Sequence, residues 1–283
     1  MLRVIDQLSW PGSPNQANED ACGVAGAWAW VIDASIFPGT TPILHDTSDA
    51  AWFASFACAR FAALATTRAD GPALVRQVVE DAAAAFMAVA PEARRDALTW
   101  PMAALTLVRA GEGRLDAWTL ADTVGYVLDG SDTCRSLGDA PAMRRRESAE
   151  AAALLSTTGA TLHELRTTEA FRDWLLGTRR RAAERGEAPV LTLTTACVAH
   201  LRHEVLELEG AATLLLASDG FSALVELYGA MDARTAMELA RSKGLAALAG
   251  ELRRIEVEQD PEARAFPRFK RSDDATALLL DVR

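Results

Sequence analysis

The first third of the chain alternates between apolar segments and polar connections. Over residues 22–32, small and large apolar residues alternate around a glycine, which predicts two short strands joined by a tight connection. The segments 48–66 and 72–89 instead carry large apolar residues at mostly helical spacing, with Ser48 or Asp49 available as the first N-cap. The pattern therefore predicts a pair of strands followed by a pair of helices.

Strand patterns return in the middle of the chain and at its end. The segments 102–111 and 115–130 are apolar and lie on either side of a short turn, which predicts two adjacent antiparallel strands. Further strands are predicted at 190–198, 204–210, 212–220 and 275–282. Helices are predicted at 221–227 and from 232 to about 256.

The segment 141–189 differs in composition from its surroundings. It is rich in helix formers and carries a net positive charge, which predicts a helical insertion within the domain. Two arginine triplets, 144–146 and 179–181, allow two interpretations. They form solvated helix faces paired with neighbouring glutamates, or they supply cations that contact a phosphate group.

The order of the elements indicates the class of fold. Strands follow one another without helical crossovers, which argues for antiparallel sheets with helices outside them. Neither glycine-rich phosphate motif, G-x-G-x-x-G or G-x-x-x-x-G-K-[ST], occurs. We therefore expect an α+β layered fold rather than a doubly wound nucleotide-binding fold, in a single domain over residues 1–283.

Composition excludes several classes of protein. The chain has 283 residues, 50% of them hydrophobic, which is ample for a buried core. Its formal net charge of −10 disfavours nucleic acid and anionic membranes as partners. Residues 1–20 lack the apolar stretch of a signal peptide, and no window approaches the length of a membrane span. We therefore expect a cytoplasmic protein.

Several acidic residues stand at the ends of apolar strands. One such carboxylate is usually a turn or cap residue, but several that converge at one rim repel each other unless they share cations. Mg²⁺ and Mn²⁺ prefer oxygen ligands, and two such ions generate a hydroxide nucleophile and neutralise a phosphoryl oxygen. The pattern therefore predicts phosphoester hydrolysis. The strand-end acids are Glu19, Asp20, Asp33, Asp122, Asp219, Asp273 and Asp274.

Five segments around these acids resemble, in order and spacing, the signature segments of the metal-dependent protein phosphatases of type 2C, the PPM family. They are 18–24 (NEDACGV), 29–35 (AWVIDAS), 120–128 (LADTVGYVL), 214–221 (LLLASDGF) and 272–280 (SDDATALLL). The resemblance runs from about Asn15 to the C-terminus. It implies a four-layer α-β-β-α sandwich of two antiparallel sheets flanked by antiparallel helix pairs. The insertion at 141–189 covers the region of the family's variable flap.

The resemblance also implies a set of metal ligands for Mn²⁺ or Mg²⁺. Asp33 matches the aspartate that bridges two ions, and Asp219 and Asp273 match the other carboxylates of the first ion. Glu19 and Asp20 match the acidic pair beside the second ion. On this basis Asp20 and Asp33 are the expected catalytic residues.

Other positions of the motif carry over less directly. Asp122 stands where the family offers an aspartate to a weaker third ion, and Ala34 would ligate through its backbone carbonyl. Asn15 stands at the phosphate-binding position, where the family commonly has an arginine whose planar fork asparagine cannot replace. The residues after Ala34 lack the family's glycines, so the loop shape there differs. No histidine closely follows Asp33, and His45 is too distant in sequence to assign.

The sequence thus favours a metal-dependent phosphatase that removes phosphate from serine and threonine residues of proteins through a metal-bridging hydroxide. Its partners would be a phosphorylated protein substrate and a Ser/Thr kinase. Two alternatives stay open. One is a catalytically weak regulatory module that binds a phosphoprotein or a kinase, and the other is a phosphatase for a small phosphorylated metabolite.

Overall fold

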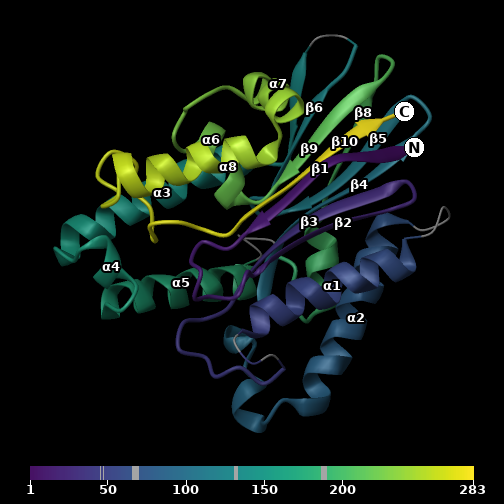
Figure 1. The fold of residues 1–283 in the computed structure, drawn as a ribbon. Helices are drawn as coiled ribbons and strands as arrows, with labels where there is room; N and C mark the ends of the chain where they lie inside the picture. The colour runs from purple at the N-terminus through teal and green to yellow at the C-terminus, as the bar shows by residue number, and fades with distance from the viewer. Residues whose placement is uncertain (45, 47, 66–69, 131–132, 186–189) are drawn as a thin grey trace.

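Two antiparallel sheets lie face to face at the centre of the molecule, with helices on both outer faces (Figure 1). The structure, a computed structural model, describes residues 1–283 apart from 45, 47, 66–69, 131–132 and 186–189. Sheet A has the strand order β1-β10-β9-β6-β7, and sheet B has the order β2-β3-β4-β5-β8. This arrangement confirms the predicted α+β class and the sandwich of two antiparallel sheets.

Side-chain alternation along the strands separates the core between the sheets from the cores beneath the helices. In β10, Leu278 and Leu280 lie between the sheets, whereas Ala277 and Leu279 pack beneath the helices of sheet A. The strands of sheet A are β1 (Leu2–Trp10), β10 (Ala275–Val282), β9 (Ala212–Ala217), β6 (Val124–Leu128) and β7 (Cys134–Leu137). Those of sheet B are β2 (Asp20–Ala25), β3 (Trp28–Ser35), β4 (Met102–Gly111), β5 (Arg114–Leu120) and β8 (Arg202–Glu207).

Helices cover the outer face of each sheet. Trp28 and Trp30 of β3 are buried among the apolar residues of the two helices on sheet B. The side chain of Ser48 accepts hydrogen bonds from two backbone N–H groups of the first turn, so Ser48 rather than Asp49 is the N-cap. Sheet B is covered by α1 (Asp49–Leu64) and α2 (Gly71–Val89). Sheet A is covered by α6 (Asp219–Glu226), α7 (Ala233–Lys243) and α8 (Leu245–Arg254).

A helical segment joins β7 to β8, in agreement with the change of composition at 141–189. It contains α3 (Ala140–Thr158), α4 (Leu162–Leu165) and α5 (Glu169–Arg185). Its small core includes Leu165, Phe171 and, from the loop before β10, Phe269. Helix α3 packs on α6, and α5 packs on the short helix η2 (Ala97–Thr99). The segment therefore spans one end of the sandwich and contacts both halves (Figure 1).

The segment 115–130 forms two strands in different sheets, so the prediction of one continuous strand was wrong. β5 belongs to sheet B and β6 to sheet A. Between them Ala121 has a φ of 60°, a left-handed conformation that turns the chain from one sheet to the other. An alanine carries no sequence signal for such a turn, and the apolar pattern continues across it.

Two further predictions differ from the structure, and two strands were not predicted. Segment 190–198 is not a strand, because among the described residues it forms only an isolated bridge, at Leu191, and a 3₁₀ helix, η3 (Thr195–His200), follows. The helix predicted from 232 to 256 is divided at Gly244, whose φ is 83°. Strands β1 and β7 were not predicted. The remaining short helices are η1 (Glu92–Arg94) and the π-helical turn η4 (Ile255–Gln259).

Among the described residues, no helix combines the length and the apolar character needed to cross a membrane.

Candidate metal centre

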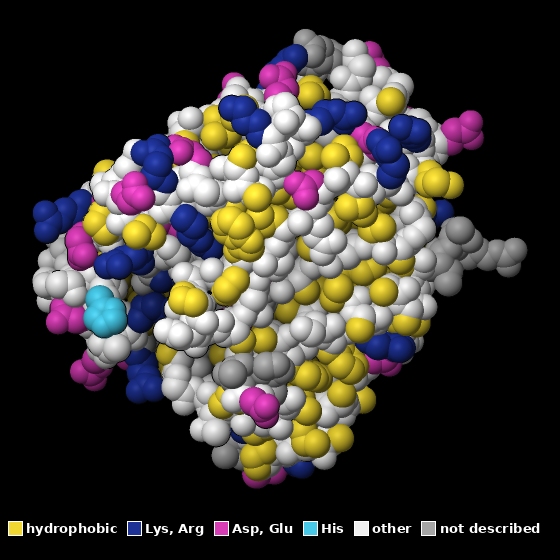
Figure 2. Space-filling view, in the orientation of Figure 1, with side chains coloured by type: hydrophobic (Ala, Val, Ile, Leu, Met, Phe, Trp, Pro, Cys, Tyr) yellow, Lys and Arg dark blue, Asp and Glu magenta, His cyan; other side chains and the backbone are white. Residues whose placement is uncertain are grey.

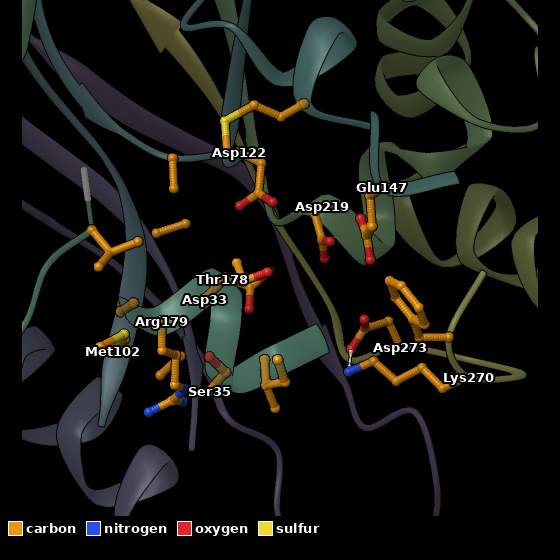
Figure 3. Close-up of a pocket in the computed structure, with 18 of the residues that line it drawn as sticks. Asp33, Ser35, Met102, Asp122, Glu147, Thr178, Arg179, Asp219, Lys270 and Asp273 are labelled. Atoms are coloured by element: carbon orange, nitrogen blue, oxygen red, sulfur yellow. Dashed lines mark ion pairs between the residues drawn. The ribbon is translucent and has the colours of Figure 1, made fainter. Parts of the chain in front are cut away.

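Carboxylates from several elements meet at one end of the sandwich. Asp33, near the end of β3, pairs in register with Asp20, the first residue of β2. Asp122 lies in the turn between β5 and β6, Asp219 begins α6, and Asp273 precedes β10. Figure 3 shows Asp33, Asp122, Asp219 and Asp273 around one common space. The structure thus brings together the strand-end acids that the sequence singled out.

Close backbone contact places Asp219 beside Asp273. The backbone N–H of Ser218 donates to the carbonyl of Thr276 at 2.9 Å, and the Ser218 hydroxyl accepts from the Thr276 N–H at 3.0 Å. At Gly220 an added Cβ would lie only 1.9 Å from the carbonyl oxygen of Asp274. A side chain at this position is therefore incompatible with the approach of α6 to the loop before β10.

Asp274 fixes the N-terminal segment of the site. One carboxylate oxygen accepts the Gly12 N–H and the other accepts the Glu19 N–H, each at 2.7 Å. Asp274 therefore positions the backbone that carries Glu19. The sequence grouped Asp274 with the other strand-end acids, but in the structure its carboxylate accepts two backbone N–H groups instead.

Glu19 and Asp20 are held by different contacts. The Ser48 hydroxyl donates to the Glu19 carboxylate, and the Glu19 carbonyl accepts the Ala34 N–H at 3.1 Å. The Asp20 N–H donates to the Asn18 side chain at 2.9 Å. One Asp20 oxygen, Oδ2, is buried and has no hydrogen-bond partner among the described residues. That oxygen is available to a ligand.

The carboxylates of the cluster repel one another, and burial adds to the cost of ionising them. Burial, followed by the charges of Asp20 and Asp219, holds the pKa of Asp33 well above its usual range. Burial and the neighbouring Asp274 likewise raise the pKa of Asp20. Burial, with the charge of Asp219 next, raises the pKa of Asp122 to about 6. Each carboxylate therefore lies where added positive charge stabilises its ionised form.

These residues fit a hard divalent cation. All donors are oxygen atoms, which Mn²⁺ and Mg²⁺ prefer, and a doubly charged ion offsets the repulsion among buried carboxylates. The unpartnered Oδ2 of Asp20 gives an independent indication, because a buried carboxylate oxygen without a partner is costly. The site thus has the chemistry of a centre for Mn²⁺ or Mg²⁺.

Comparisons with known proteins identify the fold. No family model matches the chain, and no curated protein matches it. The PPM Ser-Thr phosphatase MsPP from Mycobacterium smegmatis matches with a TM-score of 0.51 and 19% identity, over 99% of each chain. The serine/threonine phosphatase PstP/Ppp of Mycobacterium tuberculosis matches at 0.58 and 17%, over 100% of this chain and 99% of that one. The photosystem II phosphatase PBCP matches at 0.59 and 13%, with the same coverage.

The chain has the fold of the PPM phosphatases. The resemblance noted in the sequence is thereby confirmed at the level of the fold, across the whole chain. At these identities the likeness concerns the arrangement of the backbone, so the chemistry of the site rests on the residues themselves.

Two basic side chains enter the carboxylate cluster of this PPM fold. Arg144 of α3 approaches Asp219 with Nη2 at 2.8 Å from Oδ2, and its Nη1 donates to Glu147 Oε2 at 3.0 Å. Lys270, in the loop before β10, forms an ion pair with Asp273. Burial, the largest single effect, raises the pKa of Asp219, but Arg144, a hydrogen bond with Asp33 and the charge of Lys270 together outweigh it, and the net shift is downward. The cluster is therefore partly neutralised by the chain itself.

Sequence reasoning missed Glu147 and Lys270. Glu147 lies in the insertion, where the surrounding arginines made it resemble an ordinary salt-bridge partner. It follows Arg144 by three residues and so shares its helix face, which is the one signal available in the sequence. Lys270 is one of two lysines in the chain and lies three residues before Asp273. Without the conformation of this loop, that spacing does not indicate that Lys270 pairs with Asp273.

The arginines of the two triplets lie in different surroundings, and the interpretation as phosphate-contacting cations stays a prediction. Arg145, Arg180 and Arg181 are exposed, as expected of solvated helix faces. Figure 2 shows many Lys and Arg side chains on the part of the surface that α3, α4 and α5 form. Arg144 instead reaches the acidic cluster, and Arg179 is buried. The composition of the insertion could not distinguish these residues, since neighbours in one triplet differ in direction by the helical turn.

A cavity of about 300 Å³ opens beside the carboxylates (Figure 3). Its acidic wall carries Asp33, Asp122, Glu147, Asp219 and Asp273. Its apolar wall includes Met102, Phe171, Trp174 and Phe269. Its basic residues are Arg146, Arg166, Arg179 and Lys270. The insertion supplies three of these four basic residues together with Phe171 and Trp174, so it shapes the space in front of the carboxylates.

Three other sequence candidates have distinct positions. Ala34 is buried and lines the cavity next to Asp33. Asn15 is exposed in a turn and is not among the residues that line the cavity. His45 lies outside the described residues. Ala34 therefore lies at the cavity, whereas Asn15 lies on the surface outside the cavity lining.

Proposed function

We propose that this protein is a metal-dependent phosphatase that hydrolyses phosphoserine and phosphothreonine on proteins. The observation that carries the proposal is the set of half-buried aspartates that faces a cavity of about 300 Å³. A monoester dianion carries a charge that divalent cations at these aspartates would offset. The phosphorylated substrate and the Ser/Thr kinase that produces it are the proposed partners, in the cytoplasm.

The proposed ligands follow from the positions of the carboxylates. Asp33, Asp219 and Asp273, with the carbonyl of Ala34, would hold one ion. Asp33 would share its carboxylate with a second ion beside Glu19 and Asp20, and Asp122 would belong to a weaker third position. Bound Mn²⁺ or Mg²⁺ would activate water and neutralise charge on the phosphoryl group. One solved relative of the same fold contains two manganese ions.

The chain's own residues would orient the substrate and manage protons. Asp20 Oδ2 is buried and unpartnered, so it is the atom proposed to accept a proton from the attacking water. Before ions bind, Lys270 would hold Asp273 in place through their ion pair. Arg146 and Arg166 line the cavity on exposed parts of the insertion, where they would attract the phosphate dianion. They would supply the cation that Asn15 does not.

The insertion also supports a protein rather than a small metabolite as substrate. Phe171 and Trp174 of the insertion, with Phe269 from the loop before β10, form an apolar wall beside the carboxylates that offers contact area to side chains flanking a phosphorylated residue. We propose that residues 141–189 form a flap-like part of the single domain 1–283. A substrate profile that favours phosphopeptides over sugar or nucleotide phosphates is the expected result.

Hydrolysis of p-nitrophenyl phosphate tests the proposal. We expect activity that requires Mn²⁺ or Mg²⁺ and falls by about 100-fold or more in Asp33→Asn, because this residue is proposed to bridge two ions. Asp173→Asn, an exposed aspartate on α5, serves as the matched control and should retain full activity. Metal-independent hydrolysis would contradict the proposal. Binding of a phosphopeptide without release of phosphate would instead favour a regulatory module.

A further inference from the structure

Three carboxylates at the edge of the metal centre have the spacing of a cation site. Asp122, Glu147 and Asp219 each offer one oxygen, and these oxygens all lie within 4.8 Å of one another. Such a spacing suits a single cation with oxygen ligands. Two of the three residues come from the sheets' end and one comes from the insertion, so the group exists only because α3 packs on α6.

A positive charge of the chain already lies at this group. Arg144 Nη1 donates to Glu147 at 3.0 Å, and Nη2 lies 2.8 Å from an oxygen of Asp219. The Nη2 contact lacks hydrogen-bond geometry, so it is an ion pair rather than one arm of a bidentate fork. The guanidinium therefore acts toward Asp219 mainly as a charge, which is the role that an ion would have.

Packing holds Arg144 in this position. Its side chain is only 10% exposed, and the guanidinium adjoins a small cavity of about 30 Å³ lined by Gly220, Ala223 and Tyr228. Lys270, by contrast, is 42% exposed and lies on a loop, so its ammonium group can move into water when an ion arrives. Displacing Arg144 would move a packed side chain and would leave the carboxylates of Glu147 and Asp219 without their positive partner.

We propose that the Arg144 guanidinium permanently occupies the cation position formed by Asp122, Glu147 and Asp219 and so excludes a divalent ion from it. The inference rests on the ions proposed at Asp33, and it replaces one part of the proposed function, the weaker third ion at Asp122, by the Arg144 guanidinium. Asp219 then directs Oδ2 to Arg144, which leaves its other oxygen for the ions near Asp33. Arg144 is a positioning residue in this account, because it reaches the centre through Asp219.

Counting bound Mn²⁺ tests this inference. The full chain is saturated with Mn²⁺, and bound ion is measured by electron paramagnetic resonance of the free ion and by elemental analysis. We expect Arg144→Met to bind one additional Mn²⁺ per chain, whereas Arg145→Met, the exposed neighbour in the same triplet, keeps the wild-type number. Adding Glu147→Gln to Arg144→Met should remove the additional ion. A folded Arg144→Met protein with the wild-type number would overturn the inference.

A second variant keeps the test decisive if Arg144→Met does not fold. Glu147→Gln in the otherwise unchanged protein should leave the number of bound Mn²⁺ as it is, because Arg144 rather than an ion occupies the position. Loss of one Mn²⁺ in Glu147→Gln would overturn the inference. Failure of the proposed function has a different signature: a wild-type chain without Mn²⁺ that gains one ion in Arg144→Met supports this inference but contradicts the proposed metal centre.

Discussion

At the scale of single residues, the role of each aspartate depends on its neighbours rather than on its place in a motif. Asp273 and Asp274 are adjacent in the sequence, yet Asp273 faces the cavity and Asp274 accepts two backbone N–H groups. The loop that carries both residues passes directly over Gly220. The missing Cβ there lets Asp219 and Asp273, two proposed ligands from distant segments, approach closely.

Gly220→Ala tests this close approach. A Cβ would lie 1.9 Å from the Asp274 carbonyl oxygen, so the loop has to shift. We expect a loss of about 1–3 kcal/mol in the free energy of unfolding, measured with urea, together with weaker Mn²⁺ binding.

Gly250→Ala is the matched control for that substitution. Gly250 lies in α8, is exposed, and has nothing within 4 Å of the added Cβ. Because alanine is a better helix former than glycine, this variant should gain up to about 1 kcal/mol in the free energy of unfolding and bind Mn²⁺ normally. Equal behaviour of the two variants would argue against a special contact at Gly220.

At the scale of elements, the start of α1 links helix formation to the metal centre. The Ser48 hydroxyl accepts from the first turn of α1 and donates to the Glu19 carboxylate. Burial raises the pKa of Glu19, and the hydrogen bond from Ser48 opposes that shift. One side chain therefore caps a helix on sheet B and helps keep a proposed ligand ionised.

Ser48→Ala should separate these two effects. Loss of the N-cap predicts a decrease of about 1 kcal/mol in the free energy of unfolding, and loss of the hydrogen bond to Glu19 predicts weaker Mn²⁺ binding. Asp232 is the N-cap of α7, and its side chain accepts the Thr235 N–H at 2.7 Å. Asp232→Ala removes this cap. It should cost similar stability without any change in Mn²⁺ affinity, as measured by calorimetry. Unchanged affinity in Ser48→Ala would refute the proposed link.

At the scale of the whole molecule, much of the fold could be predicted because burial follows simple periods. The continuous apolar run of β10 and the helical spacing of α1 and α2 are visible in the sequence. The strand β1 was missed because charged residues such as Arg3 and Asp6 interrupt its apolar pattern. Arg3 in fact pairs with Asp281 across the sheet, a partner far away in the chain.

Only the site residues that lie at strand ends could be predicted from the sequence. Asp33, Asp219 and Asp273 follow or precede apolar strands, so their convergence could be inferred. Glu147 and Arg144 lie on a helix whose packing against α6 leaves no periodic signal. Contacts between an insertion and a core depend on the shape of both surfaces, and the pattern of a single segment does not contain that information.

In the metal-free protein, repulsion among the carboxylates should make the free energy of unfolding depend on pH. Burial and the charge of Asp219 raise the pKa of Asp122 to about 6, above its ordinary value of 3.8. The folded state therefore binds this proton more tightly, so the contribution of Asp122 to stability is fully present below about pH 4 and is lost as pH rises through about 6.

Asp122→Asn isolates this contribution. With EDTA present, the free energy of unfolding of the variant relative to wild type should rise by about 3 kcal/mol between about pH 4 and about pH 7. Urea unfolding at several pH values measures the difference, with the exposed Asp173→Asn as the control. A difference that does not change with pH would show that the proton of Asp122 is not coupled to folding.

The pairing of β1 with β10 has a consequence for how the protein is made. β1 is an edge strand whose neighbour in sheet A is β10, and nearly the whole length of the chain separates the two. A ribosome therefore releases β1 long before its partner exists, and its backbone groups stay unpaired until β10 has emerged. Asp273 emerges just ahead of β10, so a nascent chain cannot assemble the proposed metal centre before this segment has left the ribosome. The order of the segments therefore delays loading of the proposed ions until the sandwich can close.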